Sequence, residues 1–149
     1  MPLFRLFPRL LRVHGVSMAP ALRPGQVVLA VPAHWPPRRG EVVLARMPGA
    51  PERLWVKRVV GLPGEHVRLD GEGTHVDGAL LAERGVLAWG LEAPDFPVQE
   101  WALGPGECLL LGDNRADSVD SRRHGPVPRT ALVGRVRARV WPLRAARLL

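Results

Sequence analysis

The sequence contains a single cysteine, Cys108, so no disulfide can form within the chain. Stability therefore cannot depend on an oxidising compartment. Cys108 lies in an apolar run at 107–111, where a buried and inert thiol is expected. The five histidines, at positions 14, 34, 66, 75 and 124, stand far apart with no second cysteine, so no zinc site is predicted. We expect neither a metal nor another cofactor.

Lysine is just as scarce, because only Lys57 among the 21 basic residues is not arginine. A lone lysine in such a sequence indicates a need that arginine cannot meet. An amine can lose its proton, whereas a guanidinium does not deprotonate in proteins. The only serines are Ser17, Ser118 and Ser121, and the only asparagine is Asn114. These rare residues fall in two segments, which become the candidates for function.

The net charge of +7 raises the question of a nucleic-acid partner. The arginines, however, are spread along the chain with few aromatic residues among them, and no known binding module is recognisable. We expect no nucleic-acid partner. A surface for anionic lipid, or a simple compositional preference for arginine over lysine, would account for the same charge.

No stretch reaches the roughly 18 apolar residues that span a bilayer, and residues 1–13 lack the cleavage site of a secretory signal. Drawn as a helix, residues 1–13 separate two kinds of side chain, with Arg5, Arg9 and Arg12 on one side and Leu3, Phe7, Leu10 and Leu11 on the other. Such a segment could lie on an anionic membrane. Pro8 opposes a continuous helix, and a segment packed on the domain is the alternative. We expect a protein without signal peptide or transmembrane segment, either membrane-associated or cytoplasmic.

Short Val- and Leu-rich runs bounded by Gly or Pro predict β-strands at 25–31, 40–46, 54–60, 66–69, 106–111 and 132–141. This spacing favours a single, mostly antiparallel β domain over residues 1–149, arranged as a barrel or sandwich. Residues 71–105 are less periodic. They carry Trp89, Phe96 and Trp101 among Gly, Pro and acidic residues, and are predicted to form a small inserted subdomain.

Four segments, in order, resemble the signal peptidase I family. They are Gly15-Val-Ser-Met-Ala-Pro-Ala-Leu-Arg-Pro-Gly, Arg39-Gly-Glu-Val-Val-Leu, Trp55-Val-Lys-Arg-Val-Val-Gly-Leu-Pro-Gly-Glu, and the run from Gly112-Asp-Asn-Arg to His124-Gly-Pro-Val-Pro. The resemblance implies the coiled antiparallel fold shared by signal peptidases and self-cleaving repressors. It also implies a serine endopeptidase that removes N-terminal signal or leader peptides from precursor proteins, cutting after small residues.

The resemblance makes Ser17 the nucleophile and Lys57 its base. A serine hydroxyl needs an adjacent base, and a lysine is one only when neutral, so Lys57 must be buried. The Ser17 backbone N–H would donate to the oxyanion. Some relatives add a serine hydroxyl two residues earlier, where this chain has Gly15, so the second oxyanion donor is unidentified. Ala21 replaces the usual threonine.

The last segment supplies supporting residues by the same resemblance. Ser118 would orient the Lys57 amine, Asp120 would pair with Arg122, and Asp113 would pair with Arg58. Turns made by a polar loop would explain the same residues structurally. For Ser121, Asn114 and Arg115 we favour that structural role.

Other functions remain to be separated from this one. A Ser-His-Asp site using His124 would leave the unique lysine unexplained, and Ser17 lacks a Gly-x-Ser-x-Gly elbow. Only 16 residues precede Ser17, too few for the DNA-binding domain of a self-cleaving repressor. A dedicated maturation protease for one precursor, such as a nickel superoxide dismutase or a conjugation protein, is the main alternative. A non-catalytic peptide-binding β domain is the remote one.

Overall fold

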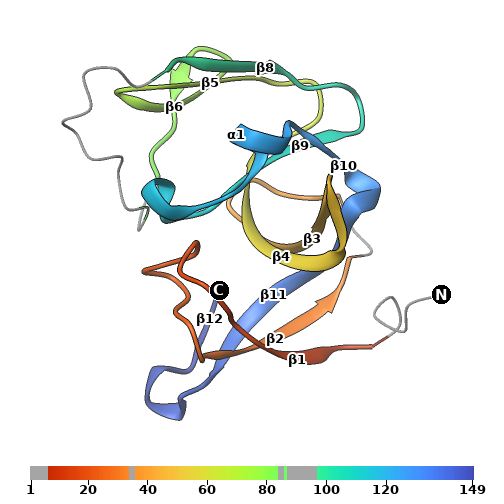
Figure 1. Ribbon diagram of the computed structural model, residues 1–149, viewed down its shortest axis with the longest axis vertical. Coiled ribbons are helices and arrows are strands. Elements are labelled where there is room, and N and C mark those ends of the chain that lie inside the picture. The colour runs from red at the N-terminus through yellow and green to blue at the C-terminus, as the bar shows by residue number, and fades with distance from the viewer. Residues whose placement is uncertain (1–6, 34–35, 84–85, 87–96) are drawn as a thin grey trace.

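The computed structural model describes residues 7–33, 36–83, 86 and 97–149, and β-strands are the main secondary structure in these ranges (Figure 1). Every strand pair within these ranges is antiparallel. The predicted fold class, mostly β with antiparallel sheets, is confirmed.

One long sheet forms the body of the molecule. Across the described ranges it has eight strands, in the order β1 (Arg9–Arg12), β2 (Val27–Pro32), β11 (Leu132–Trp141), β3 (Val42–Met47), β4 (Ala50–Gly61), β9 (Glu107–Leu111) and β10 (Val127–Pro128), with β12 (Arg147–Leu148) paired to β11. Register shifts interrupt the pairing of β11 with β2 and β3, and of β4 with β3 and β9. Such shifts bend and twist strands, and β3 and β4 curl around the centre of the molecule in Figure 1.

Strand β3 supplies side chains to two hydrophobic clusters. Val42 and Leu44 belong to one cluster, and Val43 and Ala45 belong to the other. Because side chains alternate between the faces of a strand, both faces of β3 are covered. This explains the unbroken apolar run at 42–45. Full burial of a valine or leucine side chain contributes about 1.5–3 kcal/mol.

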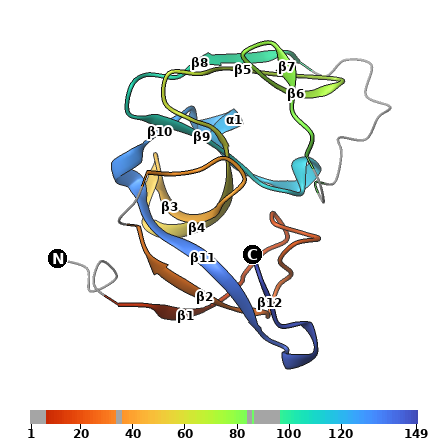
Figure 2. The same ribbon diagram turned by 180° about the vertical axis from the view of Figure 1, so that it is seen from behind.

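A smaller sheet is inserted between β4 and β9 and lies at the top of Figures 1 and 2. Its order is β7 (Ala79–Leu80), β6 (Gly73–Val76), β5 (His66–Asp70) and β8 (Gln99–Ala102). This sheet therefore begins at His66, before the limit near residue 71 that the sequence predicted. The alternating pattern of β5 resembles that of a strand in the main sheet, so it did not mark β5 as part of the insertion. Trp101 lies in β8, whereas Trp89 and Phe96 lie outside the described residues.

Residues 9–12 form strand β1 and pair with β2, so the helix drawn through them is wrong. Pairing with the edge of β2 outweighs the helical pattern of these four residues, and residues 1–6 lie outside the described ranges. Leu11 packs against the core, whereas Leu10 is exposed.

The helices in the described ranges are short: α1 (Ser121–His124) and the 3-10 turns η2 (Arg115–Asp117), η3 (Arg129–Ala131) and η4 (Leu143–Ala145). In the part of the chain described, none has the length and apolar character required to cross a membrane.

Candidate active site

Ser17 lies in a pinned loop between β1 and β2. At the base of the loop, Val13 N donates to Gln26 O at 2.8 Å. Met18 and Leu22, which follow Ser17, are 2% and 0% exposed and join the cluster beneath the loop. Two buried anchors, Met18 next to the serine and Leu22 further along the loop, therefore hold its backbone, while Ser17 itself stays partly accessible.

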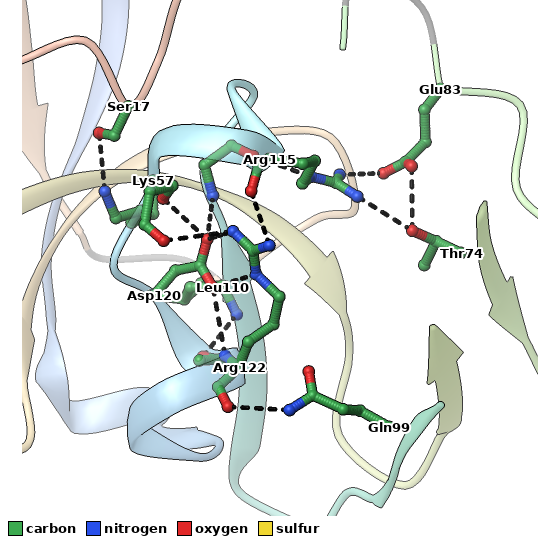
Figure 3. Close-up of polar contacts among 12 residues, drawn as sticks. Ser17, Lys57, Thr74, Glu83, Gln99, Leu110, Arg115, Asp120 and Arg122 are labelled. Carbon is green, nitrogen blue, oxygen red and sulfur yellow. Dashed lines mark hydrogen bonds and ion pairs between the residues drawn. The ribbon is translucent and has the colours of Figure 1, made fainter. Parts of the chain in front are cut away.

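Lys57 lies in β4, and its side chain is 1% exposed. Its Nζ forms a hydrogen bond with Ser17 Oγ at 2.8 Å, as Figure 3 shows. The ring of Trp55, two residues earlier on the same face of the strand, has its centroid 5.4 Å from Nζ. The structure thus brings the only lysine of the chain against a serine that lies 40 positions away in the sequence.

Burial lowers the pKa of Lys57 to about 8, because desolvation disfavours the ammonium. The Asp120 carboxylate opposes this change and raises the pKa, Arg122 lowers it, and Asp113 raises it again. At pH 7 about a tenth of the molecules then carry a neutral Lys57 amine.

Asp120 organises the loop that follows β9. Its carboxylate is fully buried and accepts five hydrogen bonds, from the backbone N–H of Gly112, the hydroxyl of Ser118, and the backbone N, Nε and Nη2 of Arg122. Burial alone would raise the pKa of Asp120, but the bonds from Arg122 and Gly112 lower it overall. The predicted partners Asp120 and Arg122 are thus together, and α1 begins at this cap.

Ser118 is predicted to orient the Lys57 amine, and that role stays a prediction. Its Oγ donates to Asp120 Oδ2 at 2.8 Å, and within the described residues no hydrogen bond joins it to Lys57. An ionised carboxylate is a stronger hydrogen-bond acceptor than a neutral group. The hydroxyl therefore reaches Lys57 only through Asp120, whose charge acts on the amine.

Asp113 and Arg58 form a two-pronged ion pair. Arg58 Nε donates to one carboxylate oxygen at 2.7 Å and Nη2 to the other at 2.6 Å, and the Asp113 side chain is fully buried. This pair ties the end of β9 to the strand position next to Lys57.

Gly112 is a residue that sequence analysis did not single out. A Cβ atom at this position would lie 2.2 Å from Ser118 Oγ, 2.6 Å from Ser118 Cβ and 2.6 Å from the Ser17 carbonyl oxygen. Only glycine at position 112 lets the chain approach Ser17 and Ser118 so closely, and no local sequence pattern predicts this contact. Asn114 N, just beyond, donates to Ser17 O at 2.9 Å and completes the junction.

Gly15 has a φ of 75°, a conformation that disfavours other residues. A serine here would be strained, so this loop geometry accounts for the missing hydroxyl. Within the part of the chain that the structure describes, no group accepts a hydrogen bond from the Ser17 backbone N–H. That donor can therefore bind another group.

The remaining candidate residues serve the fold or stand apart from Ser17. Ser121 Oγ accepts from Leu110 N at 3.0 Å inside the core. The ring of His124 lies edge-on to Trp55, with centroids 6.4 Å apart, and among described residues it makes no hydrogen bond to Ser17. Cys108 is fully buried as predicted, and burial raises the pKa of its thiol to about 11.

One group of side chains at the β5–β6 turn has the types that bind metals. The ligand atoms of Asp70, Glu72 and His75 lie within 4.8 Å of one another. Arg68 Nε, however, is 3.2 Å from the Asp70 carboxylate and already supplies positive charge. The other Asp70 oxygen accepts from Glu72 N and Gly73 N and closes the turn. The closure of this turn explains why these three side chains lie close together.

A groove of about 360 Å³ runs past the Ser17–Lys57 pair. Residues 13–18 and residues 54–57 of β4 line the groove, together with Asp117 and Val119. Only residues 58–61 of β4 pair with β9 among the described strands, so the other part of that edge faces the groove. The arrangement is a mostly apolar channel, beside an exposed strand edge, with a hydroxyl and a buried amine in its wall.

Comparison with known proteins agrees with this arrangement. Residues 3–141 match the family described as signal peptidase, peptidase S26. Signal peptidase I of Leptolyngbya laminosa is 33% identical over 137 residues, covering 85% of this chain and 66% of that protein. A probable signal peptidase I-2 of Synechocystis is 35% identical over 118 residues, covering 76% and 52%. The chain thus spans about half to two thirds of these relatives.

A solved signal peptidase I from Enterococcus faecalis has a similar fold, with a TM-score of 0.57 at 23% identity, over 66% of this chain and 94% of that one. The chain belongs to the signal peptidase family, peptidase S26.

Proposed function

We propose that this chain is a serine endopeptidase that removes N-terminal signal or leader peptides from precursor proteins. The observation that carries the proposal is the 2.8 Å contact between Ser17 Oγ and the amine of a lysine that is 1% exposed. Burial allows that amine to act as a base close to neutral pH, and its position allows it to accept the proton of the Ser17 hydroxyl. Family membership supports the peptidase class and the type of precursor.

In the proposed reaction, neutral Lys57 accepts the Ser17 proton while Oγ attacks the carbonyl carbon of the peptide bond. The resulting lysine ammonium then gives that proton to the departing amine, and an ester on Ser17 remains. A water molecule next loses a proton to Lys57 and attacks the ester. This step releases the cleaved leader peptide with a new C-terminal carboxylic acid. The proton returns to Ser17 Oγ, so the enzyme is unchanged after one cycle.

The Ser17 backbone N–H is the proposed oxyanion donor. Such a donor is typically worth about 3 kcal/mol in the transition state. Ser118 and Asp120 would fix the surroundings of the Lys57 amine, with Arg122 holding Asp120. The Arg58–Asp113 pair would keep β4 and the loop after β9 in register.

The groove suggests how a precursor binds. An extended peptide can add as a strand to the open edge of β4 at residues 54–57, facing residues 13–18. Its apolar lining suits a leader segment, and we expect small side chains before the cut.

Incubation of the purified chain with candidate precursors, followed by mass spectrometry of the new N-termini, tests the function. We expect cleavage after small residues, and none with the Ser17→Ala variant, which retains the loop anchors. Cleavage of one precursor alone would favour a dedicated maturation protease. Equal cleavage by the Ser17→Ala variant would exclude Ser17 as the nucleophile.

The pH dependence follows from the Lys57 amine. Below its pKa the amine is protonated and cannot act as a base, so kcat/KM should rise with pH through a midpoint near pH 8 and then level off. Because kcat/KM reports the free enzyme, initial rates at low substrate concentration from pH 5 to 10 measure this pKa. A rise centred near 6.5 would indicate a histidine base instead.

A peripheral contact with an anionic membrane is proposed for the lower end of the main sheet in Figure 1, where β1, η4 and β12 lie. Exposed apolar side chains gather on these elements and at the end of β11: Leu10, Trp141, Leu143 and Leu148. Arg9, Arg12, Arg144 and Arg147 are exposed on the same elements. We expect sedimentation with phosphatidylglycerol vesicles but not with phosphatidylcholine vesicles, and reduced sedimentation in high salt. Equal binding to both vesicles would contradict an electrostatic contact.

A further inference from the structure

Arg115 carries a guanidinium that is almost completely removed from water, with the whole residue 2% exposed. A buried cation is stable only when its donors have partners. Arg115 Nε donates to Gly112 O at 2.8 Å, Nη1 to Thr74 Oγ1 at 3.2 Å, and Nη2 to Glu83 Oε1 at 2.5 Å. The Thr74 hydroxyl also donates to the second Glu83 oxygen at 2.9 Å. Among these three acceptors of the guanidinium, Glu83 supplies the negative charge.

Two of these partners belong to the inserted sheet and its continuation, whereas Arg115 belongs to the loop after β9. Thr74 lies in β6 and is fully buried, and Glu83 follows β7. A second contact joins the same parts, because Gln99 Nε2 in β8 donates to Arg122 O at 3.2 Å. In Figure 3, Thr74, Glu83 and Gln99 approach the loop from the side opposite Ser17.

The loop passes this restraint to the reacting groups through short contacts. Arg122 Nη1 donates to the Arg115 carbonyl at 2.8 Å, and Arg122 also holds Asp120. On the other side of Arg115, Asn114 N donates to Ser17 O at 2.9 Å. Arg115 therefore sits between the backbone contact to the serine and the carboxylate whose charge acts on Lys57.

We propose that Glu83, with Thr74, is a positioning residue of the peptidase: it holds Arg115, and so the inserted sheet fixes the loop that keeps Lys57 buried beside Ser17. The inference rests on the proposed function but concerns side chains that do not line the groove. Removal of Glu83 takes away the carboxylate at Arg115 Nη2, which draws the guanidinium toward water. The loop at 112–120 moves with it, and water reaches Lys57.

The direction in which the pKa of Lys57 changes separates this movement of the loop from the direct electrostatic effect of removing the Glu83 charge. The charged groups that act on Lys57 are Asp120, Arg122 and Asp113. Direct loss of a negative charge at Glu83 could only lower the pKa of Lys57. Entry of water weakens the desolvation that dominates the shift, and so raises the pKa.

Because Lys57 is the only lysine, labelling lysine with ¹³C at Cε gives one side-chain signal whose pH titration reports this pKa directly. In the Glu83→Ala variant we expect the pKa to rise by at least about half a unit and kcat on a cleaved precursor to fall about 10- to 100-fold, with KM changed less. Glu83→Gln, which keeps an acceptor for Arg115, should show smaller changes of the same sign. It also serves if the alanine variant does not fold.

Glu65→Gln is the control for loss of a partly buried carboxylate, because the Glu65 side chain is 18% exposed, against 14% for Glu83, and pairs with Arg39 instead of Arg115. It should leave the lysine titration and kcat as in the wild type. A Lys57 pKa that is unchanged or lower in both Glu83 variants overturns the proposal, even if their melting temperatures fall. A raised pKa in a chain that cleaves no precursor would instead support the positioning role and overturn the proposed function.

Discussion

Replacing Lys57 with methionine should lower kcat by about 10²- to 10⁴-fold, the contribution typical of a general base. Methionine fills similar space in the apolar surroundings of β4 but cannot accept a proton. The thermal midpoint at pH 7 should not fall, because the folded wild type bears the cost of a buried ammonium that methionine lacks. Cleavage of a precursor by the variant, together with a melting curve followed by circular dichroism, measures both effects.

The Lys57→Arg variant tests whether a cation alone is sufficient. Arginine keeps the charge but does not deprotonate, so this variant should be as inactive as the methionine one. If it cleaved at a rate near that of the wild type, the amine would act as a positive charge and not as a base. More than a tenth of wild-type activity in the Lys57→Met variant would also contradict the proposal that Lys57 is the general base.

Replacing Asp120 with alanine should lower the free energy of unfolding by about 3–5 kcal/mol, because it removes the buried carboxylate that pairs with the mostly buried Arg122 cation. That is a large part of the 5–15 kcal/mol typical of a domain. Denaturation by urea at pH 7 measures the change. The Asp120 pKa is lowered on folding, so its contribution is complete above the unfolded pKa of about 3.9 and lost as pH falls through the folded value. The difference between variant and wild type should therefore shrink in acid.

Asp117→Ala is the control for this measurement, because Asp117 is exposed on the same loop and should change stability by less than about 0.5 kcal/mol. Asp120→Asn keeps an oxygen acceptor and should lose less than the alanine variant. Equal stability of Asp120→Ala and wild type would mean that the loop does not depend on this carboxylate.

Ser17 and Lys57 could be singled out as candidates because the sequence contains so few serines and only one lysine. One lysine among 21 basic residues, and three serines in two segments, leave few candidates for a nucleophile and its base. Strands at 42–47 and 107–111 were predictable for a related reason, since their apolar runs leave no other place for those side chains than a core. Strand β4 begins at Ala50, earlier than predicted, because its first residues are mostly exposed and carry no apolar pattern.

Other features depend on contacts that no local pattern encodes. Whether the Ser118 hydroxyl turns to an amine or to a carboxylate depends on where the loop places Asp120. The need for glycine at position 112 arises from a carbonyl that lies far away in the sequence. Glu83 lies in an aperiodic stretch, and only the folded chain brings it to Arg115. Residues 9–12 have a helical pattern but pair with a strand edge that the sequence does not display.

The insertion of the smaller sheet has a consequence for how this architecture can vary. The chain leaves the main sheet at Gly61 and returns so that Leu109 pairs with that same residue. The two ends of the excursion are thus fixed neighbours, and each doubling of the length between them costs only about 0.6 kcal/mol of closure entropy. Segments could be added or removed there without disturbing the register of β4 and β9, provided that the contacts from Thr74 and Glu83 are retained. The excursion is therefore the natural place to graft new sequence onto this scaffold.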